Sequence, residues 1–332
     1  MYKLFTSILT PRQCRPSGSQ WVRRCRFSSY VVTPDDLASA ISQNAPSKIS
    51  TSPKTVPLCA TWFLPNEPNQ RTGLSAFKER RIPDARFFDL DAVKDKTSPY
   101  PHMLPTPQDF AQAMQELGIN RDDTVVVYDS AELGIFSAPR VGWTLKKVFG
   151  HDKVHLLNNF RLWVEQGHPI ESGDTIPVQR SGYPVPEINS KVSSFERVRD
   201  VARDVGKEGS EGVQVLDARS GGRWAGTEPE PRPGLSSGHI PGSFSVPISE
   251  LLDPTSKALL SAPELRDLFN RKGVDPERPI ISSCGTGVTA AVIDVALDEA
   301  GYSDAQRTLY DGSWTEWAQR VTEADGLIRK KI

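Results

Sequence analysis

The segment PIISSCGTGVT (residues 279–289), followed by the apolar run AAVIDVAL (290–297), is the clearest indicator of the fold class of this chain. A short apolar run ends at Cys284, a Gly-x-Gly turn follows, and the next residues are mostly apolar and strongly helix-forming. This order is typical of a buried strand that enters a helix through a tight loop. Such a unit is the building block of a parallel sheet with crossover helices.

The residues on both sides of this segment continue the alternation. We expect a helix at residues 264–271, where Leu265, Leu268 and Phe269 recur on one face. The other expected elements are strands at residues 212–219, 243–247 and 309–314, and a turn at GHIPG (238–242). Strands that alternate with helices indicate a parallel sheet.

The first half of the chain repeats this order of elements. Its matching segments are TVPLCATWF (55–63), RIPDARFFDLD (81–91), residues 110–117, TVVVYD (124–129) and LLNNF (156–160). Asp129 and Trp163 are 34 positions apart, and their counterparts Cys284 and Trp317 are 33 apart. Spacing that is kept across separate segments indicates an internal duplication. The predicted fold class is therefore α/β, with two similar domains, each a mainly parallel sheet with helices on both faces.

Residues 1–29 have the composition of a mitochondrial transit peptide. Residues 1–34 contain six of the 40 basic residues and none of the 41 acidic ones, and RCRFSS (24–29) is similar to a matrix-peptidase site. We predict cleavage near Phe27 and residence in the mitochondrial matrix. A disordered cytosolic tail, or an additional cytoplasmic pool, stays open as an alternative.

The rest of the chain divides into two predicted domains. The first covers residues 30–172 and the second covers residues 193–328. Between them, residues 173–192 contain three prolines and little periodicity, which predicts an extended linker.

Composition and cysteine usage exclude several classes of protein. Residues 35–332 carry a net charge of −7, which gives no electrostatic basis for binding nucleic acid. No run approaches the roughly 18 apolar residues of a membrane span. Cys14, Cys25, Cys59 and Cys284 form neither a C-x-x-C metal motif nor a disulfide framework. Cys59 lies in an apolar strand and is expected to be a core residue. We therefore expect no metal and no separate cofactor.

These segments resemble the tandem-rhodanese family of sulfurtransferases over nearly all of residues 31–325. The segment CGTGVTA (284–290) is similar to the family's active loop, and GTEPEPR (226–232) followed by GHIPG (238–242) is similar to its catalytic domain. The segment SPYPHMLP (98–105) resembles the family's first domain. The resemblance implies two rhodanese-like domains and a sulfur atom carried as a persulfide on Cys284.

The loop has the features that a sulfur carrier needs. The thiolate is the nucleophile, and backbone N–H groups at the start of a helix stabilise an anion. We expect the loop residues Gly285, Gly287, Val288 and Thr289 to cradle the thiolate and the persulfide. The alternative is that Cys284 is an inert apolar residue at the end of a strand.

The resemblance also implies a proton relay of Cys284, Thr286 and Asp91. The family more commonly has serine where this chain has Thr286, and threonine adds a methyl group that restricts its rotamer. Asp91 belongs to the first domain, so the site is expected between the domains. A surface or capping role is the alternative for Asp91.

Further residues are expected to bind the sulfur donor. The resemblance assigns Arg223 and Arg232 to its carboxylate and keto groups, and His102 to the substrate side; arginine suits a carboxylate because it binds it with two hydrogen bonds. A structural ion pair is the alternative for Arg223, a solvated side chain for Arg232, and a non-catalytic histidine for His102. Arg219 is expected to hold the strand end by pairing with an acid.

The neutral residues after Cys284 favour a singly charged donor. We expect 3-mercaptopyruvate rather than the dianion thiosulfate, with cyanide or thiols such as thioredoxin as acceptors. The first domain has Asp129 at the nucleophile position and is expected to be catalytically silent. Thiosulfate as donor, a dedicated persulfide relay (for instance in tRNA thiolation) and a non-catalytic docking module are the alternatives. A phosphatase would need arginine six positions after the cysteine, where this chain has Ala290.

Overall fold

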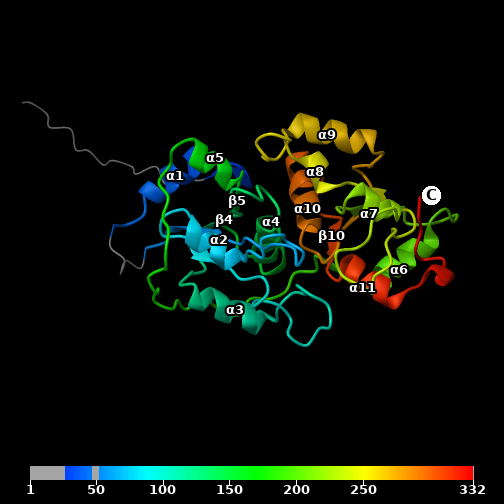
Figure 1. Cartoon of the computed structure of the whole chain (residues 1–332), viewed down its shortest axis with the longest axis horizontal. Coiled ribbons are helices and arrows are strands. Elements are labelled where there is room, and N and C mark those ends of the chain that lie inside the picture. Colours follow the sequence, from blue (N-terminus) through cyan, green and yellow to red (C-terminus); the bar gives the residue numbers. More distant parts are fainter. Residues whose placement is uncertain (1–26, 47–51, 332) are drawn as a thin grey trace, which may run out of the picture.

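The computed structural model describes residues 27–46 and 52–331, which form two α/β halves side by side (Figure 1). The predicted transit peptide lies almost wholly outside these residues. The first half contains β1 (Val31–Val32), α1 (Pro34–Ser42), β2 (Thr55–Cys59), α2 (Gly73–Glu79), β3 (Arg86–Phe87), α3 (Pro107–Glu116), β4 (Thr124–Tyr128), α4 (Ala138–Trp143), the π-helix η1 (Thr144–Val148), β5 (Val154–Leu157) and α5 (Phe160–Glu165). The second half contains β6 (Val192–Ser193), α6 (Phe195–Asp204), β7 (Gln214–Asp217), α7 (Gly221–Ala225), β8 (Phe244–Ser245), α8 (Ile248–Leu251), α9 (Ala262–Arg271), β9 (Ile280–Ser283), α10 (Ala290–Glu299), β10 (Arg307–Tyr310), α11 (Ser313–Arg320) and the 3-10 helix η2 (Glu323–Asp325).

Each half contains one five-stranded sheet, and the two sheets have the same topology. The strand order is β1-β5-β4-β2-β3 in the first and β6-β10-β9-β7-β8 in the second, and every named pair is parallel. The duplication predicted from spacing is therefore present in the fold. Because all strands run the same way, their carboxyl ends lie at one edge of each sheet, where ligands of such folds bind.

Helices cover both faces of each sheet, as predicted. In β9, Ile280 joins the apolar cluster that contains α9 and α10, whereas Ile281 joins the cluster that contains α6 and α11. In β10, Leu309 and Tyr310 divide in the same way. This alternation follows from the two-residue period of a strand, and burial on both faces explains the continuous apolar runs in the sequence.

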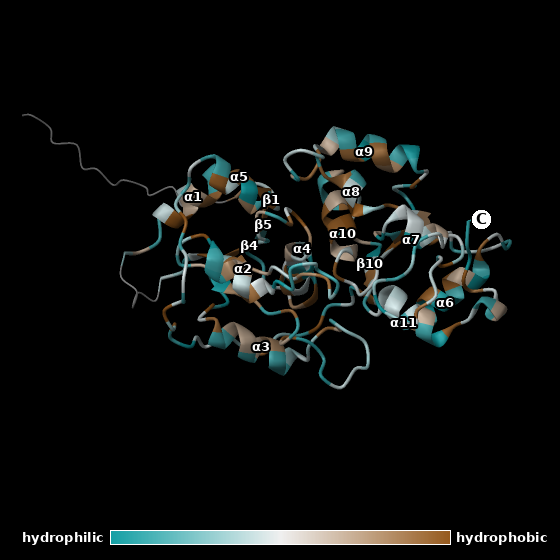
Figure 2. Ribbon diagram, in the orientation of Figure 1, coloured by the Kyte–Doolittle hydropathy of each residue, from teal (hydrophilic) through white to brown (hydrophobic). Residues whose placement is uncertain are grey.

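The two halves share one apolar core at their boundary. Helix α10, coloured brown in Figure 2, packs against α4 of the first half, and both belong to a single buried cluster. Beside it, Lys147 Nζ lies 3.0 Å from Asp294, 2.8 Å from Asp298 and 2.7 Å from Asp304. A shared core with buried ion pairs fixes the orientation of the halves, so a site can be assembled across the boundary.

The predicted core strands and helices are present, but sequence analysis missed short elements. The two-residue edge strands β1 and β6 are too short to show a period. Residues 173–190 contain no helix or strand, and Tyr183 within them is buried beside His151, with ring centroids 5.8 Å apart. The domain and linker boundaries stay predictions. No helix in the described part of the chain is long and apolar enough to span a membrane.

Candidate active site

Cys284 lies at the carboxyl end of β9, directly before the loop that enters α10. Its side chain is buried, with the residue 1% exposed. Within the described residues, no side chain forms a hydrogen bond to its sulfur. The position is the carboxyl edge of a parallel sheet, at the boundary of the two halves, where the site was predicted from the sequence.

Ser313 holds the Cys284 loop in shape, and no sequence pattern predicted this role. Its Oγ accepts hydrogen bonds from the backbone N–H groups of Cys284 and Gly287, each at 3.1 Å, and donates to the carbonyl of Tyr310 at 2.8 Å. Ser313 is fully buried and has a φ of +47°, a strained conformation for a residue with a side chain. A serine after Asp-Gly reads as an ordinary turn residue, so only the fold reveals these contacts.

The loop glycines have different roles from one another. Gly287 has a φ of +76°, and a Cβ there would lie 2.7 Å from the carbonyl oxygen of Asp311, so only glycine fits. Its N–H donates to Ser313 and therefore does not point at the sulfur, which differs from the expectation for Gly287. A Cβ on Gly285 would lie 3.2 Å from Arg223 Nη2, so Gly285 leaves room for that side chain.

The other loop N–H groups are free to bind an anion. In the described part of the chain, the N–H groups of Gly285, Thr286, Val288 and Thr289 donate to no protein acceptor. They lie next to Cys284 at the N-terminus of α10. Three of these four residues are the ones that sequence analysis assigned to the cradle beside Gly287.

A chain of hydrogen bonds joins the loop to the first half. Thr286 Oγ1 lies 3.2 Å from His102 Nδ1, and His102 Nε2 lies 3.1 Å from Asp91 Oδ1. Trp62 Nε1 donates to the second oxygen of Asp91 at 3.0 Å. Asp91 therefore reaches Thr286 through His102, not directly, and His102 lies between two members of the predicted relay.

The environment of His102 fixes its protonation. Burial lowers the pKa of His102 below its ordinary value, although the hydrogen bond to Asp91 opposes this effect. The hydrogen bond from His102 is the main reason that the pKa of Asp91 is lowered. A charged Asp91 beside a neutral His102 implies that Nε2–H donates to Asp91, which leaves Nδ1 as an acceptor for the Thr286 hydroxyl.

Arg140 of α4 ties the two halves together at the site. Its guanidinium is buried, pairs with Asp311, donates to the carbonyl of His102 at 2.8 Å and lies 3.4 Å from the carbonyl oxygen of Gly287. The other Asp311 oxygen accepts from the N–H of Leu104 at 2.9 Å. One side chain thus positions both the His102 backbone and the Cys284 loop, and sequence analysis did not single it out.

The predicted donor-binding arginines differ in their partners. Arg223 pairs with Glu230, whose side chain is 2% exposed. Glu230 also accepts from Arg219 at 2.8 Å, and Arg219 pairs with Asp217 at 2.6 Å, which confirms the structural role expected of Arg219. Arg232 has no ion pair or hydrogen bond among the described residues. Burial lowers the pKa of Arg232, and the nearby charge of Cys284 opposes this effect.

The first half has a carboxylate where the second half has the cysteine. Asp129 Oδ2 accepts from the N–H groups of Phe136, Ser137 and Ala138 at 2.8–2.9 Å, and Oδ1 accepts from the Ser137 hydroxyl at 2.5 Å. Burial raises the pKa of Asp129 to about 6, and the hydrogen bonds oppose this effect. Three N–H groups at the end of this loop are therefore already occupied by its own carboxylate. Cys59 is buried in the core, as expected.

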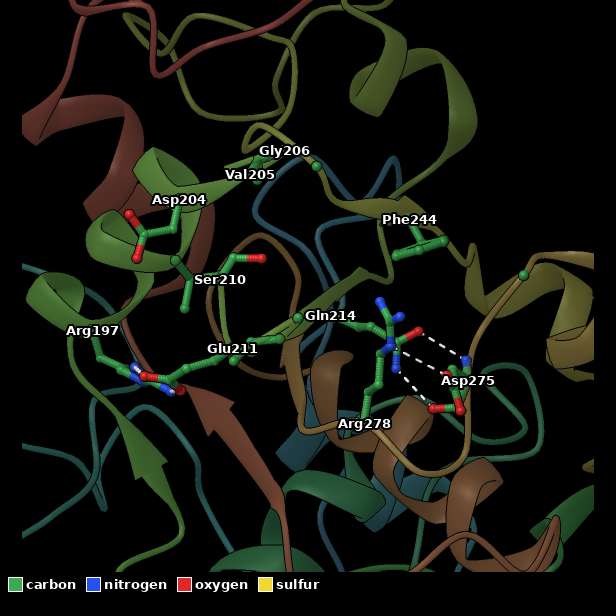
Figure 3. A pocket seen from close by; sticks show the side chains of 15 residues that line it. Arg197, Asp204, Val205, Gly206, Ser210, Glu211, Gln214, Phe244, Asp275 and Arg278 are labelled. Atoms are coloured by element: carbon green, nitrogen blue, oxygen red, sulfur yellow. Dashed lines mark hydrogen bonds and ion pairs between the residues drawn. The ribbon is translucent and has the colours of Figure 1, made fainter. Parts of the chain in front are cut away.

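One hollow of the second half lies away from Cys284. Figure 3 shows it at the amino-terminal end of β7, next to the C-terminal end of α6. The charged side chains that line it include two pairs: Arg197 with Glu211, and Arg278 with Asp275. No residue of the candidate site lines it. The described residues contain no group of three or more His, Cys, Asp or Glu side chains placed to hold a metal ion.

Comparisons with known proteins agree with this arrangement. Residues 202–320 match the family profile described as Rhodanese-like domain. The chain is 41% identical over 296 residues to "Thiosulfate sulfurtransferase TUM1" of Saccharomyces cerevisiae (strain ATCC 204508 / S288c), which covers 85% of this chain and 95% of that protein. It is 41% identical over 266 residues to "3-mercaptopyruvate sulfurtransferase" of Rattus norvegicus, which covers 80% of this chain and 85% of that protein.

A solved structure extends the similarity to three dimensions. The cryo-EM structure of the yeast mitochondrial complex I sub-stoichiometric sulfur transferase subunit matches with a TM-score of 0.80 at 37% identity, and covers 92% of this chain and 100% of that one. Such identity over most of both chains extends well beyond the one matched domain. The chain therefore belongs to the rhodanese family and is a sulfurtransferase.

Proposed function

We propose that this sulfurtransferase takes sulfur from 3-mercaptopyruvate, carries it as a persulfide on Cys284 and passes it to a thiol or cyanide. The observation that carries the proposal is the loop after Cys284. The N–H groups of Gly285, Thr286, Val288 and Thr289 have no protein acceptor in the described structure, and the Thr286 hydroxyl is hydrogen-bonded to a neutral histidine. A sulfur anion and a proton-accepting chain are the two requirements of the transfer.

The first half-reaction uses the Cys284 thiolate as nucleophile. The thiolate attacks the sulfur of mercaptopyruvate, a sulfur–sulfur bond forms, and the bond between the donor's sulfur and its CH₂ carbon breaks. The electron pair of that bond goes to pyruvate as its enolate, which takes up the proton of the donor's thiol. The products are the Cys284 persulfide and pyruvate. In the second half-reaction an acceptor thiolate takes the outer sulfur and restores the thiolate of Cys284.

The residues of the hydrogen-bonded chain are proposed to move the donor's proton. The Thr286 oxygen accepts the thiol proton while its own hydroxyl proton passes to His102 Nδ1. Asp91 stabilises the imidazolium that forms, as a carboxylate does in a Ser-His-Asp triad. His102 then returns the proton through Thr286 to the enolate. In this mechanism the donor lies between Thr286 and Cys284, so no hydrogen bond between these two side chains is needed.

Arg223 and Arg232 are proposed to bind the donor's carboxylate and keto group. Both lie next to the loop: Arg223 Nη2 borders Gly285, and the pKa of Arg232, lowered by burial, also responds to the charge of Cys284. Thiosulfate is the second candidate donor, because several relatives are named for it. The neutral Gly285-Thr286-Gly287 segment favours the singly charged donor.

The setting of the reaction follows from the same proposal. The transfer needs a sulfur donor and a thiol acceptor, and thioredoxin is a proposed acceptor. The persulfide is the only carrier that we invoke, without a separate cofactor. We propose residence in the mitochondrial matrix, which the basic N-terminal segment and the mitochondrial relative support.

The test is direct detection of the carrier and of its turnover. Mass spectrometry after incubation with mercaptopyruvate should show one added sulfur on the peptide that contains Cys284, and none in Cys284→Ser. The kcat/KM for mercaptopyruvate should exceed that for thiosulfate. Full turnover by Cys284→Ser would overturn the mechanism, and a large thiosulfate preference would overturn the choice of donor.

A further inference from the structure

Glu230 is a buried carboxylate in contact with Arg223, one of the two arginines proposed to bind the donor. Both of its oxygens lie 3.2 Å from Arg223 Nε, one pairs with Arg223 Nη2, and the other accepts from Arg219 Nη1 at 2.8 Å. Its side chain is 2% exposed. Because Arg219 already pairs with Asp217, with both side chains 1% exposed, the charge of Glu230 is left to balance Arg223.

Arg232 is the one cation of this cluster without an ion pair among the described residues, although the charges of Glu230 and Asp91 act on it from farther away. In that part of the chain it makes no ion pair and no hydrogen bond, and it is only partly exposed. The loop and the histidine beside it add no positive charge. Gly285, Thr286 and Gly287 are neutral, and burial keeps His102 neutral near pH 7.

Near Cys284 the described part of the site therefore offers one positive charge that belongs to no ion pair, that of Arg232. A donor with one carboxylate matches that charge. A dianion carries an additional negative charge, which the Cys284 thiolate and Glu230 repel. This repulsion is weakly screened because the site is buried.

We propose that Glu230 is a specificity-determining residue: by neutralising Arg223 it restricts the pocket to one effective cation and favours singly charged donors over thiosulfate. This inference rests on the proposed function and goes further, because it assigns the discrimination to a carboxylate that touches no reacting atom. The neutral loop permits the preference, and Glu230 sets it.

The experiment compares donor preference in Glu230→Gln with that in the wild type. The substitution removes one negative charge and keeps an oxygen that accepts hydrogen bonds. A dianion gains about twice as much as a monoanion from the added field, so the ratio of kcat/KM for thiosulfate to that for mercaptopyruvate should rise about tenfold. Rates are normalised to the fraction of protein that forms the Cys284 persulfide, which corrects for misfolded material.

Glu228→Gln is the matched control. Glu228 lies two residues earlier in the same loop, is exposed and bonds to the Ser220 hydroxyl at 2.9 Å. It loses the same charge outside the pocket, where water screens its field, so the donor ratio should stay within about twofold of the wild type. An equal rise in both variants would overturn the proposal.

A second comparison separates charge from geometry. If Glu230 only orients Arg223, then Glu230→Gln should change nothing in an Arg223→Gln background. If the charge of Glu230 sets the preference, the ratio of kcat/KM for thiosulfate to that for mercaptopyruvate should be higher in the double variant than in Arg223→Gln alone. The factor should be about the same as between Glu230→Gln and the wild type. This pair also provides the test if Glu230→Gln alone does not fold.

The outcomes distinguish the two levels of the argument. A wild type that forms no persulfide from mercaptopyruvate, or that prefers thiosulfate, contradicts the proposed function. A wild type that prefers mercaptopyruvate, together with an unchanged ratio in Glu230→Gln, contradicts only the role of Glu230.

Discussion

The loops that follow β4 and β9 occupy the same place in two copies of one fold, yet only one suits chemistry. After β4, the Asp129 carboxylate accepts three N–H groups and one hydroxyl from its own loop. After β9, the N–H groups next to Cys284 have no protein acceptor in the described structure, and Ser313 supports the loop from behind. In the first copy the anion bound by the loop is the carboxylate of Asp129, a permanent part of the fold. In the second copy the loop N–H groups remain available to bind an anion reversibly.

The comparison shows how a duplicated site becomes structural. A carboxylate satisfies the loop permanently, so the first copy gains order and cannot accept a ligand. It still contributes to the site of the second copy, because Asp91, His102 and Arg140 all come from the first half. The first half is therefore a source of side chains for the loop of the second half.

The largest effect is expected when the two loops exchange roles. Cys284→Ser should lower kcat/KM by at least about 10⁴-fold. Adding Asp129→Cys should not restore activity, because the first loop has neither the Gly-x-Gly turn nor His102 and the arginines beside it. Steady-state kinetics and persulfide mapping measure both effects. Sulfur transfer through the thiol introduced in the double variant would show that the two loops are equivalent.

The next prediction concerns stability. Asp129→Ala leaves several buried donors without an acceptor and should lower the free energy of unfolding by about 3 kcal/mol. Cys284→Ala removes a side chain that accepts from none of its neighbours in the described structure and should cost only about 1 kcal/mol. Denaturant melts of both variants test the difference. Similar costs would mean that the loop around Cys284 is as dependent on its side chain as the loop around Asp129.

Ser313 should be a positioning residue. Ser313→Gly relieves the positive φ but removes the hydroxyl that holds the loop, so kcat/KM should fall roughly 10- to 100-fold with little loss of stability. Ser313→Ala removes the hydroxyl and keeps the strain, and should lose activity to a similar extent while also melting earlier. If the glycine variant kept full activity, backbone conformation alone would be what Ser313 provides.

The burial of His102 predicts a dependence of stability on pH. Its pKa is lower in the folded protein than the ordinary value near 6.5 of an unfolded chain, so the unfolded state binds more protons below that value. The stability that neutral His102 contributes is therefore fully present above pH 6.5 and is lost as the pH falls. Between pH 6.5 and 5.5 the free energy of unfolding of His102→Gln should fall less steeply than that of the wild type, by up to about 1.4 kcal/mol per pH unit. Identical slopes in both proteins would contradict a neutral, buried His102.

The smallest effect is expected at Thr286. Thr286→Ser keeps the hydroxyl bonded to His102 and should change kcat/KM by no more than about threefold, because only rotamer freedom differs. Thr286→Ala removes the hydroxyl and should cost about 10²-fold. Loss of activity in the serine variant would show that the methyl group, and not the hydroxyl, is what the site requires.

Sequence patterns were sufficient to predict the elements that depend on neighbours along the chain. The apolar runs of β9 and β10, the helix after Cys284 and the repeated spacing of the matching segments predicted the two α/β halves, because these patterns follow from local backbone geometry. The glycines of the loop and the aspartate at position 129 likewise predicted that the second copy carries the chemistry.

How these elements meet became known only from the folded molecule. Thr286 and His102 are 184 positions apart and touch because the two halves share a core, and Ser313 reaches the loop across 29 positions through a strained turn. Glu230 and Arg140 left no sequence signal, since a carboxylate or a guanidinium in a polar segment reads as solvated until packing buries it. Contacts between distant residues depend on how whole sheets and helices pack, which no local pattern encodes.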